Sequence, residues 1–227
     1  MPPGTSNMDE AAPSTGAQLR TPKAAAIAGI VFAILLIAIF ILLRSAVPGS
    51  PTEAGDWLVE DWHTAAIALN LIPFAGVAFL WFIGVLRDRL GAKEDRFFAT
   101  VFFGSSLLFL GLIFTAASLV GALILVGTAV GPGALAGTPT FYLARAASFI
   151  LVNVYAAKVA TVFMVSTSTV IVYTRIAPRW IALLGYALAV VLLAGSYVTT
   201  WVIVVMPLWV LLISVAILID NLREPSA

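Results

Sequence analysis

Long runs without a charged side chain constrain this protein more than any other feature of its sequence. Ala24 to Leu43 is an uncharged run of 20 residues, and Trp180 to Ile219 is one of 40. A hydrocarbon core about 30 Å thick needs roughly 20 helical residues to cross it. Strands and loops in lipid would leave backbone groups without hydrogen-bond partners, so such segments must be helical. The runs predict an all-α, polytopic transmembrane helix bundle in the lipid bilayer, with no soluble domain.

Six spans follow from the positions of charged and turn-forming residues. We expect them at about 24–43, 64–86, 97–127, 142–173, 180–195 and 201–219. The last two share the 40-residue run, because one helix of that length would rise about 60 Å, twice the core thickness. The spans make up one domain over 24–220. It is flanked by an expected disordered cytoplasmic tail over 1–23, rich in Pro, Gly and Ser, and a short cytoplasmic tail over 221–227.

The first span also invites comparison with a signal peptide. The apolar region of a signal peptide is about 7 to 15 residues long and leads to a cleavage site between small residues. The run from Ala24 to Leu43 is longer than that. An uncleaved membrane anchor is therefore the favoured interpretation, with cleavage as the alternative.

Positive charges predict the orientation. Of the twelve Lys and Arg residues, nine lie at one set of span ends: Arg20, Lys23, Arg87, Arg89, Lys93, Arg96, Arg175, Arg179 and Arg223. Arg44 and Arg145 lie at the other set, and Lys158 lies within a span. Since Lys and Arg concentrate on the cytoplasmic side, both termini are expected there. The composition suits a plasma (inner) membrane, and we expect a bacterial one.

Composition and motifs exclude several function classes. The chain has no cysteine and one histidine, which rules out disulfides, thiolate metal sites and any centre built from two histidines. A net charge of +1 provides no field for capturing nucleic acid. No nucleophile elbow and no phosphate-binding loop is present. We expect a non-enzymatic protein without a cofactor, although a membrane-embedded enzyme remains an alternative.

An acidic segment before the second span holds the only candidates for a metal site. Glu53, Asp56, Asp61 and His63 lie within eleven residues, and hard cations favour clustered carboxylate oxygens. The spacing matches no known ligand motif. A solvated loop is therefore the favoured interpretation, and no metal is expected. The connection between the third and fourth spans, 128–140, carries no charge and is expected to be an apolar loop at the membrane interface.

Lys158 is the residue that most needs an explanation. It follows Arg145 by 13 residues, about 20 Å along a helix, which puts it near the bilayer midplane. A charge there costs about 2.5 to 3.5 kcal/mol on insertion scales and should face the interior of the bundle. Tyr155, Asn70 and the carbonyl freed by Pro73 are the expected acceptors. Lys158 is then either a structural lysine or, with Tyr155 and Asn70, the ligand contact of an internal site.

One stretch resembles known proteins. The segment from Pro73 to Gly91, PFAGVAFLWFIGVLRDRLG, together with Glu94 to Gly104, EDRFFATVFFG, is similar to conserved hypothetical membrane proteins of bacteria. The resemblance implies a bacterial membrane location and carries no activity and no site residues. Because candidates for a catalytic acid, base or metal are so few, we expect a non-enzymatic membrane component, such as an accessory subunit that packs with a partner subunit; a homo-oligomer is the other assembly considered. The alternative is a small-molecule or ion permease with its polar site around Lys158.

Overall fold

The protein is all-α, as the uncharged runs predict. The computed structural model describes residues 22–88, 96–195 and 200–223. Five helical segments within these ranges are long and apolar enough to cross a membrane. They are α1 (Pro22–Ala46), α3 (Trp62–Asp88), α4 (Arg96–Val130), the continuous run of α6 (Pro139–Ile150), η2 (Leu151–Ala156) and α7 (Ala157–Thr174), and lastly η3 (Thr200–Val204) with α9 (Val205–Arg223).

A sixth apolar helix is shorter. The 40-residue uncharged run contains α8 (Arg179–Gly195), then η3 and α9. With 17 residues, α8 rises only about 25 Å. The turn expected at 196–200 falls mainly on residues 196–199, which lie outside the described ranges, as do most of the expected tails.

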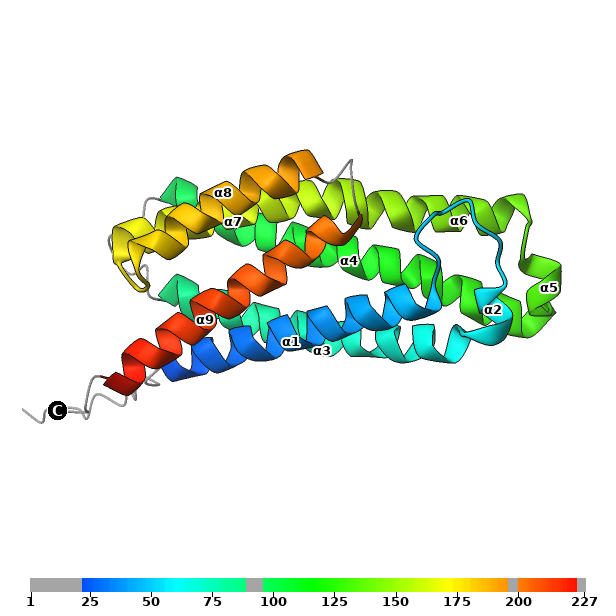
Figure 1. Ribbon diagram of the computed structural model, residues 1–227, viewed down its shortest axis with the longest axis horizontal. Coiled ribbons are helices and arrows are strands. Elements are labelled where there is room, and N and C mark those ends of the chain that lie inside the picture. Colours follow the sequence, from blue (N-terminus) through cyan, green and yellow to red (C-terminus); the bar gives the residue numbers. More distant parts are fainter. Residues whose placement is uncertain (1–21, 89–95, 196–199, 224–227) are drawn as a thin grey trace, which may run out of the picture.

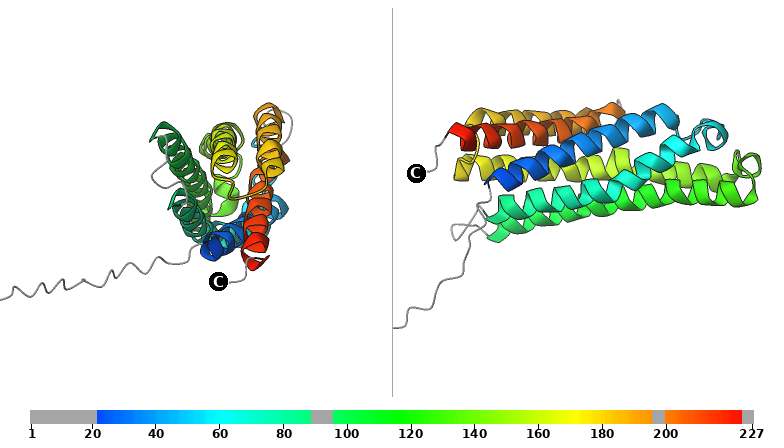
Figure 2. Two further views of the ribbon diagram at one scale, coloured as in Figure 1. Left: turned by 90° about the vertical axis from the view of Figure 1, so that its left-hand side faces the viewer. Right: turned by 90° about the horizontal axis from the view of Figure 1, so that it is seen from below.

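The long helices lie side by side along one axis (Figures 1 and 2). Helix α1 packs on α3 and α9, α4 packs on α3 and α7, and α8 packs on α7 and α9. The start of α1 and the end of α9 lie at the same end of the molecule, which we call the termini end. The opposite end carries α2 (Trp57–Glu60) and α5 (Pro132–Leu135), and we call it the cap end.

Phenylalanines fill the centre of the bundle. Phe79 of α3 stacks on Phe32 of α1 with ring centroids 4.4 Å apart. Its ring also meets Phe163 of α7 at 5.2 Å and Phe109 of α4 at 5.8 Å, both edge to face. All four side chains are essentially inaccessible. Because lipid is as apolar as these rings, the helices gain from close packing here rather than from exclusion of water.

Two glycines allow the helices to approach closely. A Cβ on Gly29 of α1 would collide with Ser214 of α9 and Phe82 of α3. A Cβ on Gly185 of α8 would collide with Ser168 of α7 and Trp209 of α9. Small residues at such positions are a common means of packing helices in membranes.

The cap end differs from the two loops expected from sequence. The segments 45–63 and 128–140 each contain a short helix, α2 and α5. Together with the ends of α3, α4 and α6 they enclose a second apolar core, made of Ala46, Val47, Trp57, Leu58, Ala65, Val120, Leu123, Ile124, Leu135 and Phe141. The short helices are additions to the expected connections, and they form because some apolar side chains of the two segments bury one another. The acidic side chains Glu53, Asp56 and Asp61 are exposed, as expected for a solvated loop.

Candidate functional site

A cavity of about 130 Å³ lies toward the cap end of the bundle. A single water needs only about 10 to 15 Å³ on the same measure, so the space is large enough for a small ligand or an ionic group. Its walls come from α1, α3, α4, α6, η2 and η3. Most lining residues are apolar, and the polar side chains among them are Arg44, Arg145, Ser148 and Asn153. We call this cavity the arginine pocket.

Arg145 is held by the chain that follows α1. Helix α6 begins at Pro139, and the Thr138 side chain caps it by accepting a hydrogen bond from the Phe141 N–H at 3.2 Å. Arg145 lies about two turns further along and is only 7% exposed. Its Nη2 donates to the carbonyl oxygen of Pro48 at 2.8 Å and weakly to that of Ser50 at 3.4 Å.

An aromatic ring completes the surroundings of Arg145. Its guanidinium carbon lies 5.8 Å from the centre of the Trp57 ring, in cation–π geometry. Trp57 is itself buried in the second apolar core, at the cap end. Arg145 thereby connects α6 to residues 48–50 and to α2, which closes the cap end of the pocket.

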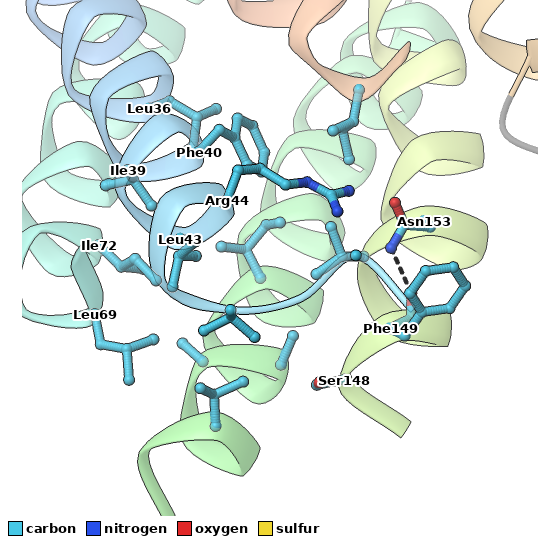
Figure 3. A pocket seen from close by; sticks show the side chains of 18 of the residues that line it. Leu36, Ile39, Phe40, Leu43, Arg44, Leu69, Ile72, Ser148, Phe149 and Asn153 are labelled. Carbon is cyan, nitrogen blue, oxygen red and sulfur yellow. Dashed lines mark hydrogen bonds between the residues drawn. The ribbon is translucent and has the colours of Figure 1, made fainter. Parts of the chain in front are cut away.

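Arg44 approaches the pocket from the last turn of α1. A cation at this position is favoured by the partial negative charge of the helix C-terminus. Its guanidinium carbon lies 5.7 Å from the centre of the Trp201 ring. A Cβ on Gly49 would stand 3.0 Å from Arg44 Nη1, so the arginine lies directly against that turn. Figure 3 shows its side chain reaching across the cavity toward Asn153.

Asn153 lies in a stretch of π-helix, η2. Such stretches are rare and occur frequently at functional sites. The side chain is 8% exposed, and its Nδ2 donates to the Phe149 carbonyl at 3.0 Å. This bond uses the amide nitrogen and leaves the amide oxygen on the side of the cavity that faces Arg44 (Figure 3).

The charges of the pocket are all positive. No acidic side chain lines it, and within the described part of the chain neither arginine forms an ion pair. Arg44 and Glu53 are the charged groups that act on Arg145 from nearby: Arg44 repels it, and Glu53, which does not line the pocket, attracts it. Two cations in mostly apolar surroundings are costly unless an anion compensates them. Guanidinium groups bind carboxylates and phosphates through paired hydrogen bonds, so the arrangement suits such an anion.

The residues expected to form a ligand site around Lys158 do not line this pocket. Lys158 lies half-buried in α7. Tyr155 is 53% exposed. Asn70 is exposed on α3, and its Nδ2 donates to the Ala66 carbonyl one turn earlier at 2.9 Å. Tyr155 lies in η2, which has more residues per turn than the α-helix assumed when Tyr155 was expected to be an acceptor for Lys158. A site that uses Lys158 stays a prediction.

The weak metal candidates are also apart. Among the residues that the structure describes, no three His, Asp or Glu side chains gather closely enough to hold a metal ion. His63 stacks on Trp62 with ring centroids 3.6 Å apart. The Glu53 carboxylate accepts a hydrogen bond from the Ser50 N–H at 3.3 Å. Asp56 and Asp61 flank the short helix α2.

Sequence reasoning overlooked the arginine pocket. Arg44 and Arg145 were considered there only as the two cations at the span ends with few positive charges. The available signal was that each lies at the end of a span, next to a Trp-containing or Gly-containing connection. Their approach to one pocket depends on contacts between residues about 100 positions apart in the chain, which no spacing rule provides.

Comparisons of the chain with models of protein families, with curated proteins and with solved structures found no match. Any statement about function must therefore rest on the geometry and chemistry of the pocket itself.

Proposed function

We propose that this chain is a non-enzymatic, multi-pass protein of a bacterial plasma membrane that binds an anionic ligand in the arginine pocket. The observation that carries the proposal is the pair Arg44 and Arg145. Both line an apolar cavity, and none of the described residues in its walls is acidic. Arg145 is buried, and a buried cation is costly unless another charge compensates it. An anion would compensate both charges at once.

The proposed orientation follows from the positive charges of the sequence. With both termini in the cytoplasm, the cap end and the arginine pocket face outward. The resemblance of residues 73–104 to bacterial membrane proteins supports the choice of membrane. The pocket would then receive its ligand from outside the cell or from the outer leaflet.

A role as an accessory subunit is compatible with ligand binding and has an observation of its own in its favour. Near the cap end, α4 and α6 expose large apolar side chains, with Leu125 and Leu143 each about 70% exposed. Helix α4 is ten residues longer than α1, about 15 Å, so its last turns project past the end of α1. An apolar face there suits a second copy of this chain or a partner subunit. The alternative, a permease with its site at Lys158, has the half-buried lysine itself in its favour.

Binding of a small anion tests the main proposal. Purified protein in dodecyl maltoside would be titrated with hexanoate and, separately, with uncharged hexanamide, with thermal unfolding as the readout. We expect hexanoate to stabilise the wild type and hexanamide to have little effect. Arg44→Gln should weaken hexanoate binding by about tenfold or more, because a buried charge pair is worth at least 1.4 kcal/mol.

Arg179→Gln is a matched control. Arg179 is exposed at the start of α8 and does not line the pocket. It should bind hexanoate like the wild type. The proposal is wrong if hexanamide stabilises the protein as well as hexanoate does, or if Arg44→Gln and Arg179→Gln respond alike.

A further inference from the structure

We infer that the anion bound in the arginine pocket is the headgroup of an anionic phospholipid, which reaches the pocket sideways from the bilayer. This inference rests on the proposed function and names the class of ligand. It follows from three features: where the wall of the bundle ends, the depth at which it ends, and the residues that lie below the arginines.

Among the described residues, the helices beside the pocket differ in how far they reach toward the cap end. Helices α8 and α9 have 17 and 19 residues, whereas α4 has 35 and the run from α6 to α7 has 36. In Figure 1, α8 and the start of α9 end part-way along the bundle, while α4 and α6 continue to the cap end. The pocket lies at this point. Trp201, Ile203 and Val204 of η3 line it on one side, and Val47, Pro48 and Gly49 on another. We infer that a lipid enters between these two segments, and we call this place the window.

Two independent measures put the window at the level of the lipid headgroups. The apolar part of α1, Ala26–Ala46, has 21 residues and rises about 31 Å, which matches a hydrocarbon core of about 30 Å. Arg44 lies two residues before its end. Trp201 lies over the Arg44 guanidinium and is 54% exposed. Tryptophan side chains gather at headgroup level, so an exposed Trp beside an Arg is expected there.

The residues below Arg44 suit an acyl chain. Phe40, Ile39 and Leu36 line the pocket from one to two turns earlier in α1, up to about 12 Å deeper in the bundle. A phospholipid would place its phosphate between the two guanidinium groups and one chain against these side chains. The Asn153 amide oxygen could accept a hydrogen bond from a headgroup hydroxyl. A free inorganic anion would leave the apolar walls without a partner.

Lipid selectivity tests the inference. The protein in detergent would be titrated with phosphatidylglycerol and phosphatidylcholine of identical acyl chains, and bound lipids counted by native mass spectrometry. We expect phosphatidylglycerol to bind about tenfold more tightly or better in the wild type. Arg44→Gln should remove this preference, and Arg179→Gln should retain it. Inorganic phosphate, titrated alone, should bind far more weakly than phosphatidylglycerol.

A variant that narrows the window separates the inference from the proposed function. Val204 is half-buried at the edge of the pocket. Val204→Trp should lose phosphatidylglycerol and keep hexanoate, because the short anion does not need room for a second chain. Should this variant fail to fold, the comparison of the two lipids in the wild type and in Arg44→Gln still decides.

The outcomes are distinguishable. Equal binding of the two lipids, together with hexanoate binding that depends on Arg44, would overturn the lipid inference and leave the proposed function standing. Phosphate that binds as tightly as phosphatidylglycerol would overturn it as well, because the acyl chain would then contribute nothing. Loss of hexanoate binding in addition would overturn both.

Discussion

Replacing Arg145 by methionine is expected to loosen the cap end of the protein, whereas the same change at Arg44 is not. Arg145 is 7% exposed and donates a 2.8 Å hydrogen bond to the Pro48 carbonyl. Arg44 is half-buried, and its contact with Trp201 involves a ring that is largely exposed. Methionine fills a similar space without the charge. The pair of variants therefore compares an arginine that also holds the cap end with one that has weaker contacts to the rest of the protein.

The magnitude follows from the contacts of Arg145. Its charge-assisted hydrogen bond to Pro48 contributes about 1.5 to 3 kcal/mol. The cation–π contact with buried Trp57 adds about 1 kcal/mol, and the 3.4 Å contact with Ser50 adds little. Removing the cation also removes the cost of burying its charge, which offsets part of this loss. We expect a net loss of about 2 kcal/mol, and less than about 1 kcal/mol for Arg44→Met.

Thermal unfolding and thiol labelling would measure the effect. At roughly 2 to 4 °C per kcal/mol for a chain of this size, Arg145→Met should lower Tm by about 4 to 8 °C. Because the chain has no native cysteine, Val47→Cys can report on opening of the cap, since Val47 is only 8% exposed. Its labelling rate should rise about thirtyfold in the Arg145→Met background, because 2 kcal/mol changes an opening equilibrium by that factor.

The reasoning would be refuted if Arg145→Met unfolded at the wild-type temperature, or if Arg44→Met lost as much stability as Arg145→Met. Unchanged labelling of Val47→Cys in the presence of a lowered Tm would also contradict it. In that case the arginine would stabilise the bundle without holding the segment around residues 48–50.

Gly185→Val should lower stability by about 1 to 3 kcal/mol, because its side chain would force α8 away from α7 and α9. Gly104→Ala, where a Cβ meets nothing within 4 Å, is the matched control and should unfold within about 0.5 kcal/mol of the wild type. For the orientation, an impermeant thiol reagent on intact cells should label Glu53→Cys and not Ala92→Cys; the reverse pattern would invert the proposed topology. Lys158→Met should lower the Tm and leave hexanoate binding unchanged, because Lys158 does not line the arginine pocket. Loss of hexanoate binding at unchanged Tm would instead make Lys158 part of the site.

The helices of this protein could be predicted from sequence because each depends on local properties. Uncharged runs long enough to cross a bilayer must be helical, since lipid offers no partner for free backbone groups. The division of the run from Trp180 to Ile219 into α8 and α9 follows from length alone. Charge, composition and the lack of cysteine are likewise read from the chain without a structure.

The cap end and the arginine pocket could not be predicted in this way. Pro132 and Gly133 indicated a loop at 128–140, yet α5 forms there because Leu135 is buried in a core shared with α2 and α4. The polar residues singled out from sequence show the same limit. Asn70 donates a hydrogen bond within its own helix and lies exposed, while Asn153, which was not among the expected site residues, lines the cavity.

The sequence by itself determined that this protein consists of apolar helices of membrane-spanning length and set the positions of their charged ends. Only the tertiary structure decided that Arg44 and Arg145, about 100 residues apart, line one cavity. The physical reason is the range of the interactions. Helix formation in an apolar run depends on neighbours within a few residues, whereas a pocket depends on the order in which helices pack. That order is set by close approaches such as those at Gly29 and Gly185, which no local pattern reveals.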